Sequence, residues 1–324
     1  MNDVLIIGAG PAGLACAIAA SRAGLTCCIV EQGSVADAIR RFPVNMTWFS
    51  TPELLEIGEV PFVIPTVRPT RVDTLNYYLR VARHFSLDIR THQRVTDIQR
   101  NSAQGFVVRT AAGATFDAVH VVIATGYYDH PVHLGVPGED LPHVRSYYDE
   151  PFAYAGKRVV VIGGRNSAVE TALDLYRHNA RVTLVHRGPS LSAGVKYWIQ
   201  PDCENRIKAG QIAAVFGATV RSIAPDSVTV AVDGGERSIP ADFVFVMVGF
   251  GPDSVLLRKA GVELDPETLA PRVSGQTWET NVPGLFVAGS VVAGKNTNAI
   301  FVENGRLHGE TIARAILARR NRIS

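Results

Sequence analysis

Two glycine-rich turns, at residues 8–13 (GAGPAG) and 163–168 (GGRNSA), constrain the fold of this chain more than any other feature. Each turn follows a short apolar run and precedes a segment with the apolar spacing of a helix. A strand, a tight turn and a helix in this order direct free backbone N–H groups and the positive helix end toward a pyrophosphate, and glycine lets the backbone approach closely. The repeated pattern predicts two nucleotide-binding units in one chain.

The residue that ends the second strand of each unit distinguishes the two nucleotides. Glu31 stands 23 residues after Gly8, and His186 stands 23 residues after Gly163, so the two units are in register. A carboxylate at this position accepts hydrogen bonds from the ribose hydroxyls of an adenosine, whereas His186 and Arg187 offer donors and positive charge suited to a 2′-phosphate. The first unit is predicted to bind FAD and the second NADPH.

The order of the segments predicts the domain organisation. A chain of 324 residues is long enough for two domains of about 100 to 200 residues each. We expect an α/β fold of two Rossmann-like, three-layer domains, the second inserted into the first. The FAD-binding domain is predicted to comprise residues 1–126 and 250–324, and the NADPH-binding domain residues 127–249.

Local patterns predict several further elements. Residues 72–85 have helical spacing, with Thr70 or Asp73 as the cap. Residues 40–71 are interpreted as a loop that covers a ligand, and residues 299–317 as one helix. Strands are expected at 114–116 and 118–123, and an antiparallel insert at 219–239 with a hairpin signal at 233–235 (DGG).

Composition excludes several classes of protein. The net charge is +2 and no apolar run reaches the roughly 18 residues of a membrane span, so we expect no nucleic-acid or membrane partner. No leader peptide is expected, because the first apolar run enters the glycine-rich turn directly. The four cysteines form no C-x-x-C pair and no zinc spacing, which favours a cytoplasmic protein with neither disulfides nor a metal site.

With these residues in place, the chain resembles the low-molecular-weight thioredoxin reductase branch of the pyridine nucleotide-disulfide oxidoreductases over nearly its full length. The resemblance rests on both glycine-rich turns, Glu31, the ATG at 124–126 and the TNVPGLFVAG at 280–289. Within that branch, KYWIQP at 196–201 and FVENG at 301–305 are most similar to the YpdA-type bacillithiol-disulfide reductases.

The resemblance implies an NADPH-dependent flavoprotein oxidoreductase that passes hydride to FAD and electrons onward to a small-molecule or protein acceptor. It implies a low-molecular-weight thiol disulfide, such as bacillithiol disulfide, as that acceptor, and a homodimer. Thioredoxin reductases carry a C-x-x-C in the NADPH domain, where this chain has only Cys203. The YpdA-type proteins place a reactive cysteine inside the first turn, where this chain has Ala12.

Two other cysteines are left as catalytic candidates. Cys16 lies nearly one helical turn beyond Gly13 and is either an inert packing residue or a redox thiol. Cys203 follows Pro201 and Asp202 at an expected helix start, where the helix dipole favours a thiolate, and is otherwise an ordinary surface residue.

The expected cofactor contacts follow from the turns and the resemblance. Arg165 replaces the second glycine of the NADPH turn and can donate to the pyrophosphate directly. Ser290 stands where thioredoxin reductases have an aspartate on the ribityl chain. The expected FAD contacts are Gly8, Gly10, Pro11, Ala12, Gly13, Glu31, Gln32, Asn45, Thr47, Val95, Ala124, Thr125, Gly126, Gly289, Ser290 and Ile300. The expected NADPH contacts are Gly163, Gly164, Arg165, Asn166, Ser167, Ala168, His186 and Arg187.

Several interpretations stay open on the sequence. The aromatic residues Trp48, Phe49, Tyr77 and Tyr78 either stack on a ring or fill the core. Lys196 and Trp198 either receive an anionic substrate or the nicotinamide side, or are a solvated lysine and a buried tryptophan.

Two other functions compete with the reductase. A flavin-dependent monooxygenase is an alternative, because GEDLPHVRSY at 138–147 resembles part of that family's signature. A non-catalytic flavin- and nucleotide-binding redox sensor is the other.

Overall fold

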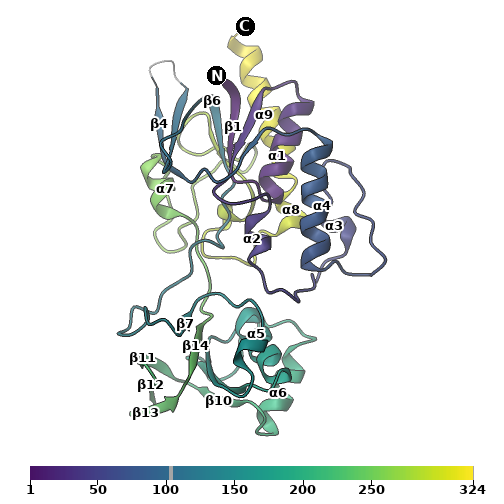
Figure 1. The fold of residues 1–324 in the computed structure, drawn as a ribbon. Helices are drawn as coiled ribbons and strands as arrows, with labels where there is room; N and C mark the ends of the chain where they lie inside the picture. Colours follow the sequence, from purple (N-terminus) through teal and green to yellow (C-terminus); the bar gives the residue numbers. More distant parts are fainter. Residues whose placement is uncertain (102–104, 324) are drawn as a thin grey trace. The chain divides into compact units, whose positions relative to one another are not determined.

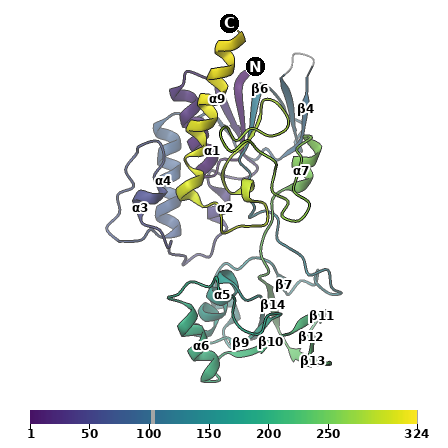
Figure 2. The same cartoon turned by 180° about the vertical axis from the view of Figure 1, so that it is seen from behind.

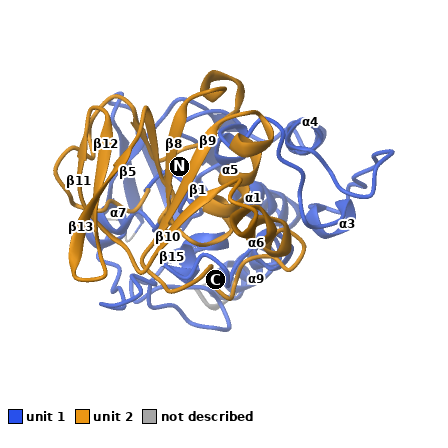
Figure 3. Cartoon of the chain, turned by 90° about the horizontal axis from the view of Figure 1, so that it is seen from below, with its two compact units in different colours: residues 1–130, 250–324 blue, residues 131–249 orange. Residues whose placement is uncertain are grey.

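The computed structural model describes residues 1–101 and 105–323, with side chains up to residue 320. The chain forms two compact units, Met1–His130 with Phe250–Ser324, and Pro131–Gly249, so the second is inserted in the first (Figure 3). The domains expected from the sequence divide the chain at 126/127 and 249/250, whereas the compact units divide it at 130/131 and 249/250.

Unit 1 is built on a seven-stranded mixed sheet of order β3-β2-β1-β6-β5-β4, with β15 also paired to β6. Its strands are β1 (Asn2–Ile7), β2 (Cys27–Val30), β3 (Ile89–Arg90), β4 (Val95–Arg100), β5 (Phe106–Thr110), β6 (Thr115–Ile123) and β15 (Leu285–Val287). The pairs among β1, β2, β3, β6 and β15 are parallel, and β4, β5 and β6 pair antiparallel.

Strand β6 is longer than predicted. Residues 114–116 and 118–123 were expected as two strands, but one strand runs from Thr115 to Ile123. Residues 115–118 pair with β5, residues 121–123 pair with β15, and residues 118–123 pair with β1, which bridges the two halves. Hydrogen bonding to these three partners keeps the segment extended throughout.

Helices cover both faces of this sheet. Figures 1 and 2 show α1, α4 and α9 on one face and α7 on the other. The apolar residues of the two faces form separate cores, one around Leu14, Ile18 and Tyr78 and one around Leu5 and Leu257. The helical elements of unit 1 are α1 (Pro11–Arg22), α2 (Asp37–Arg40), α3 (Pro52–Leu55), α4 (Arg71–His84), α7 (Ser254–Lys259), η2 (Gly289–Ala293), α8 (Val302–Gly305) and α9 (His308–Ile323).

The start of α4 confirms Thr70 as the helix cap. The Thr70 hydroxyl accepts the Asp73 N–H at 3.2 Å, and the Asp73 carboxylate accepts the Thr70 N–H at 2.9 Å. This reciprocal pair is a capping box, which satisfies donors that the first turn of a helix leaves without partners.

One helix prediction in unit 1 is wrong. Residues 299–317 form not one helix but α8 and α9, which are separated at Arg306 and Leu307. A Cβ on Gly305, the last residue of α8, would lie only 3.2 Å from the Gly289 Cα, so this turn packs closely on another segment. The segment at 40–71 is a loop as expected, apart from the short helix α3, and the side chain of Arg306 donates to the carbonyls of Glu53 and Glu56 at the end of α3.

Unit 2 contains a five-stranded parallel sheet of order β10-β9-β8-β14-β7 and a three-stranded antiparallel sheet. The parallel strands are β7 (Val144–Arg145), β8 (Arg158–Ile162), β9 (Arg181–His186), β10 (Ala213–Phe216) and β14 (Phe243–Val246), with η1 (Phe152–Tyr154), α5 (Asn166–Arg177) and α6 (Gln200–Lys208). The antiparallel strands are β11 (Thr219–Ala224), β12 (Ser227–Val232) and β13 (Gly235–Pro240). Asp233 and Gly234 both have positive φ, as the predicted tight hairpin requires.

No helix of the described chain is long and apolar enough to cross a membrane.

The contact between α1 and α9 depends on a small residue, which gives a first prediction. A Cβ on Gly309 would lie 2.8 Å from the Cys16 Cα and from the Ala15 carbonyl oxygen. We expect Gly309→Ala to lower the free energy of unfolding by about 1 to 2 kcal/mol, because overpacking outweighs the better helix propensity of alanine. Thermal denaturation measures this, and Gly275→Ala, which meets no atom within 4 Å, is the control. Equal melting temperatures for both variants would contradict the prediction.

Candidate functional site

The first glycine-rich turn joins β1 to α1 and has no room for side chains at its two ends. A Cβ on Gly8, where φ is +110°, would lie 2.6 Å from the Ala124 carbonyl oxygen, and one on Gly13 would lie 1.9 Å from the Gly8 carbonyl oxygen. A Cβ on Gly10 would meet nothing within 4 Å. The turn therefore packs tightly on the sheet and leaves an open face at Gly10, where a phosphate can approach the backbone.

Glu31 ties the end of β2 to this turn. Its carboxylate accepts the Ala9 N–H at 2.6 Å and the Gly33 N–H at 2.7 Å, and the residue is 6% exposed. Burial raises the pKa of Glu31, and these two hydrogen bonds oppose that rise. Each carboxylate oxygen has a second lone pair, so the group can still accept hydrogen bonds from ribose hydroxyls.

The segment before β4 extends this end of the site. The N–H groups of His92 and Gln93 donate to the carbonyls of Gly33 and Glu31, at 3.1 and 2.8 Å. Gln32 is therefore held between them and is exposed, while Val95 follows as a buried residue of β4.

The other predicted FAD residues meet where β6 and β15 end side by side. A Cβ on Gly289 would lie 2.6 Å from the Ala12 Cβ, and one on Gly126 would lie 3.5 Å from the Ser290 Oγ. Ile300 lies against Gly305, which in turn packs on Gly289. Three segments far apart in the sequence thus form one polar and glycine-lined edge.

Two buried polar atoms in unit 1 fit a polar ligand. Within the described residues, neither the Thr125 hydroxyl nor the Trp48 indole N–H has a hydrogen-bond partner. Burial of such groups without partners is unfavourable, so a ligand group bonded to them stabilises the fold. The orphan Thr125 hydroxyl and the open glycine backbone are both consistent with a bound dinucleotide.

The loop at 42–50 contains two of the expected FAD residues and two of the aromatic residues. Asn45 and Thr47 are exposed, and the backbone of Thr47 pairs with Thr70 in an isolated β-bridge. Of the aromatic residues, Trp48, Tyr77 and Tyr78 are core residues, and Phe49 is exposed. The hydroxyl of Tyr77 donates to the Val60 carbonyl at 2.8 Å and that of Tyr78 to the Leu55 carbonyl at 2.9 Å.

Sequence reasoning missed several polar residues beside this edge. Ser50 is buried and donates to the Glu303 carboxylate of α8, whose other oxygen is buried without a partner among the described residues. The imidazole of His308, at the start of α9, accepts the Gly289 N–H at 3.2 Å. No local pattern pointed to these contacts, because their partners are at least 19 residues away in the sequence.

The second glycine-rich turn joins β8 to α5 and packs as tightly as the first. A Cβ on Gly163, where φ is +145°, would lie 2.4 Å from the Met247 carbonyl oxygen, and one on Gly164 would lie 2.5 Å from the His186 ring. Burial lowers the pKa of His186, and the charges of Arg187 and Arg165 lower it further. The imidazole is therefore neutral at pH 7 and lies in the field of two guanidinium groups beside the turn.

Asn166, the first residue of α5, fixes the loop that follows β9. Its side chain accepts the Lys196 N–H at 2.8 Å and donates to the Gly194 carbonyl at 3.3 Å. Lys196 forms an ion pair with Glu170, and Trp198 is 41% exposed, so the interpretation as a solvated lysine with a buried tryptophan is wrong. Ser167 is exposed beside Arg165, and Ala168 is buried against Gly163.

None of the four thiols has the surroundings of a reactive cysteine. Cys16, Cys28 and Cys203 are buried, and burial raises the pKa of Cys16 to about 12 and that of Cys28 and of Cys203 to about 11. Burial also raises the pKa of Cys27. The surface interpretation of Cys203 is wrong, because apolar neighbours enclose it in the core of unit 2. Since the thiolate is the nucleophile, these thiols are unreactive at neutral pH.

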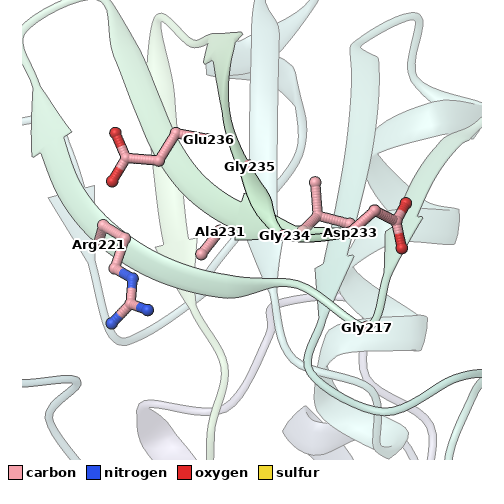
Figure 4. Close-up of a pocket in the computed structure, with 8 residues that line it drawn as sticks. Gly217, Arg221, Ala231, Asp233, Gly234, Gly235 and Glu236 are labelled. Carbon is pink, nitrogen blue, oxygen red and sulfur yellow. The ribbon is translucent and has the colours of Figure 1, made fainter.

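Among the described residues, neither a metal-ligand cluster nor the groove in unit 2 contributes to the candidate site. Over residues 1–101 and 105–323, no group of three or more His, Cys, Asp or Glu side chains could hold a metal ion. Figure 4 shows an open groove over the antiparallel sheet of unit 2, lined by Gly217, Arg221, Ala231, Val232, Asp233, Gly234, Gly235 and Glu236. The groove includes no residue of either glycine-rich turn.

Comparison with known proteins agrees with this geometry. The family model described as pyridine nucleotide-disulphide oxidoreductase matches residues 5–289. The chain is 42% identical to the bacilliredoxin reductase Bdr of Bacillus subtilis over 323 residues, which cover 99% of both chains.

Two solved structures extend the comparison. The bacillithiol disulfide reductase Bdr (YpdA) of Bacillus cereus has a TM-score of 0.95 at 41% identity and covers 98% of this chain and 99% of its own. The enzyme of the same name from Staphylococcus aureus has a TM-score of 0.94 at 36% identity and covers 98% of both chains. These matches confirm the predicted resemblance and the fold class.

The two glycine environments give a paired prediction. We expect Gly13→Ala to lower the free energy of unfolding by about 3 kcal/mol or more, because its Cβ would strike a backbone oxygen. Gly10→Ala has free space and should leave the stability of the apoprotein unchanged while reducing retained flavin. Thermal denaturation and the ratio of flavin to protein absorbance measure both effects. A Gly13→Ala protein as stable as wild type would refute the steric argument.

Proposed function

The chain belongs to the pyridine nucleotide-disulphide oxidoreductase family, and on that premise we propose that it is an NADPH-dependent reductase of a low-molecular-weight thiol disulfide. Members of this family are flavin oxidoreductases, so the chain is an oxidoreductase whose cofactors are FAD and NADPH. The proposed substrate class follows from relatives at 42 and 41% identity, whose names state bacilliredoxin and bacillithiol disulfide.

One observation carries the proposal: two tight glycine turns of the same architecture have oppositely charged neighbours. Glu31 lies beside the first turn, and Arg165 and Arg187 lie beside the second. We assign FAD to unit 1 and NADPH to unit 2 on this difference, because an unmodified ribose needs an acceptor and a 2′-phosphate needs positive charge.

The residues proposed to hold FAD belong to unit 1 and act mainly through their backbone. The turn at 8–13 offers N–H groups at the start of α1, and Glu31 orients the adenosine ribose. Thr125 and Ser290 offer hydroxyls at the other end of the edge, where the flavin ring is proposed to lie. When bound, FAD accepts a hydride from NADPH and supplies two electrons for the reduction of the acceptor.

The residues proposed to hold NADPH belong to unit 2. The backbone of the turn at 163–168 receives the pyrophosphate, and Arg165 adds a direct donor. The 2′-phosphate is held by Arg187 and by His186, whose ring is fixed against Gly164. Asn166 serves this site indirectly, by holding the loop that contains Lys196 and Trp198.

The test begins with anaerobic reduction of the yellow protein. We expect NADPH to bleach the flavin absorbance rapidly, and bacillithiol disulfide to restore it with the release of two thiols per flavin. A protein that stays yellow would refute the proposed reductase and favour a redox sensor. Bleaching that only oxygen reverses, with hydroxylation of an added substrate, would favour a monooxygenase.

The segment that suggested a monooxygenase has a structural role in unit 2. The Glu139 carboxylate accepts the Leu134 and Gly135 N–H groups, each at 2.8 Å. A Cβ on Gly138 would lie 1.9 Å from the Ile223 carbonyl oxygen, so this glycine is needed for close packing. These contacts give Gly138 and Glu139 structural roles within unit 2.

We also propose a homodimer, as the resemblance implies, and expect no nucleic-acid or membrane partner from the net charge and the lack of a long apolar run. Size-exclusion chromatography with light scattering tests this directly, and a monomeric mass would refute it.

A charge variant tests the NADPH assignment. We expect Arg187→Leu to raise the dissociation constant for NADPH about 10-fold or more, because a charge-assisted hydrogen bond to the 2′-phosphate is lost. The dissociation constant for NADH should stay unchanged, because NADH has no 2′-phosphate. Titration of the flavin-loaded enzyme with each nucleotide measures this. Arg181→Leu, at the exposed start of β9, is the control. A loss shared by both nucleotides would contradict the assignment.

The burial of the thiols gives a second prediction for this function. We expect Cys16→Ala and Cys203→Ala proteins, once folded, to keep the wild-type rate of disulfide reduction, because neither thiol reaches the substrate. Reduction by NADPH should also expose no additional thiol to an alkylating reagent. The gain of a labelled cysteine on reduction would show that an enzyme thiol takes part.

A further inference from the structure

His308 occupies an unusual place for an imidazole. It is the first residue of α9 and is 4% exposed, and its ring is stacked on Trp278 with centroids 4.0 Å apart and planes 17° from parallel. Its Nδ1 accepts the Gly289 N–H at 3.2 Å, which places the ring proton on Nε2. Burial lowers the pKa of His308 to about 4, so the ring is a neutral acceptor at pH 7.

The Gly289 N–H, which donates to His308, lies where the hydrogen bonds between β15 and β6 end. The Ala288 N–H still donates to the Ile123 carbonyl of β6, at 2.9 Å. Ala288 is extended, with φ −135° and ψ 149°, so the next N–H, that of Gly289, points to the opposite side and away from β6. The backbone then turns into the left-handed region at Gly289, where φ is +74°. Leaving a buried backbone N–H without an acceptor is unfavourable, and the imidazole provides the acceptor.

Gly289 is also enclosed on two other sides. Its missing Cβ would lie 2.6 Å from the Ala12 Cβ of the first turn, and Gly305 of α8 approaches its Cα. The position of Gly289 therefore determines where Ser290, the next residue, meets Gly126. Three segments of the proposed flavin edge therefore meet at Gly289.

Trp278 links His308 to the same strand. Its carbonyl accepts the Val287 N–H of β15 at 3.0 Å, while its ring stacks on the imidazole. Trp278 has φ +61°, a conformation that a bulky residue adopts only when its surroundings enforce it. The end of β15 and the imidazole are thus held by one residue, which fixes the direction of Nδ1.

We propose that His308 is a positioning residue for the flavin: its imidazole holds Gly289 in the left-handed turn that presents Ser290 and Ala12 to the cofactor. The proposal rests on the proposed function, in which residues 289 and 290 contact FAD. His308 acts through the backbone and touches neither nucleotide. Its loss weakens FAD binding and changes the electronic surroundings of the ring, and leaves the NADPH site of unit 2 intact.

The test compares three variants that separate the acceptor from the ring. His308→Asn places Oδ1 near the position of Nδ1 and keeps the acceptor. His308→Gln is equally polar but places its oxygen farther out, near the position of Nε2, and His308→Phe keeps the ring and removes the acceptor. The readouts are the dissociation constant for FAD, obtained by titrating the apoprotein, the midpoint potential of the bound flavin, and the dissociation constant for NADPH.

We expect His308→Phe and His308→Gln to raise the dissociation constant for FAD about 10-fold and to shift the flavin midpoint potential, because both leave the Gly289 N–H unsatisfied. His308→Asn should stay within about threefold of wild type, and NADPH binding should not change in any variant. If His308→Phe does not fold, the Asn and Gln pair decides alone. Equal FAD binding and potential in Asn and Gln variants would overturn the proposal.

The outcomes for the two proposals are distinct. A wild-type protein that binds no FAD would refute the proposed function itself. A wild-type protein that binds FAD, with all three variants like it, would overturn only the role of His308.

Discussion

The rest of unit 1 depends on one steric constraint, which is the contact of backbone with backbone where β1, β6 and β15 end. At Gly8 and Gly13 an added Cβ would come within 2.6 and 1.9 Å of carbonyl oxygens, and at Gly289 within 2.6 Å of the Ala12 Cβ. Such distances exclude any side chain at the three glycines. Because the strands converge this closely, free N–H groups and hydroxyls concentrate along one edge, and a dinucleotide can lie on it.

The same turn architecture in unit 2 has different charges beside it, and the proposed assignment of NADPH to this unit rests on them. Gly163 repeats the close contact of Gly8, with the Met247 carbonyl in the place of the Ala124 carbonyl. The difference lies at the end of the second strand, where Glu31 accepts a hydrogen bond from its own turn and His186 packs against Gly164 in the field of Arg165 and Arg187. Different residues thus determine the turn and the charge beside it. The glycines determine the conformation of the turn, and the residue at the end of the second strand determines the charge.

Local sequence patterns correctly predicted the features that depend on a few consecutive residues. Both turns, the Thr70 cap and the hairpin at Asp233 lie at the predicted positions, since each depends on backbone conformation over a few residues. The errors have long-range causes. Strand β6 is continuous and pairs with three strands, β1, β5 and β15, and the C-terminal helix is interrupted next to Gly305, which packs closely on Gly289. Periodicity within one segment contains no information on either contact.

The proposed flavin edge shows the same limit at the level of single side chains. The glycines and Glu31 were predicted from their spacing in the sequence, whereas the groups that hold them follow no such pattern. Gly289 and its imidazole partner are 19 residues apart, and Ser50 and Glu303 are 253 apart. A neutral histidine is well suited to such a place, since its burial lowers its pKa far enough that it accepts a hydrogen bond throughout the neutral range. The turn at 8–13 is therefore local in the sequence, whereas the groups that hold the rest of the proposed edge, His308 and Glu303, come from the C-terminal part of the chain.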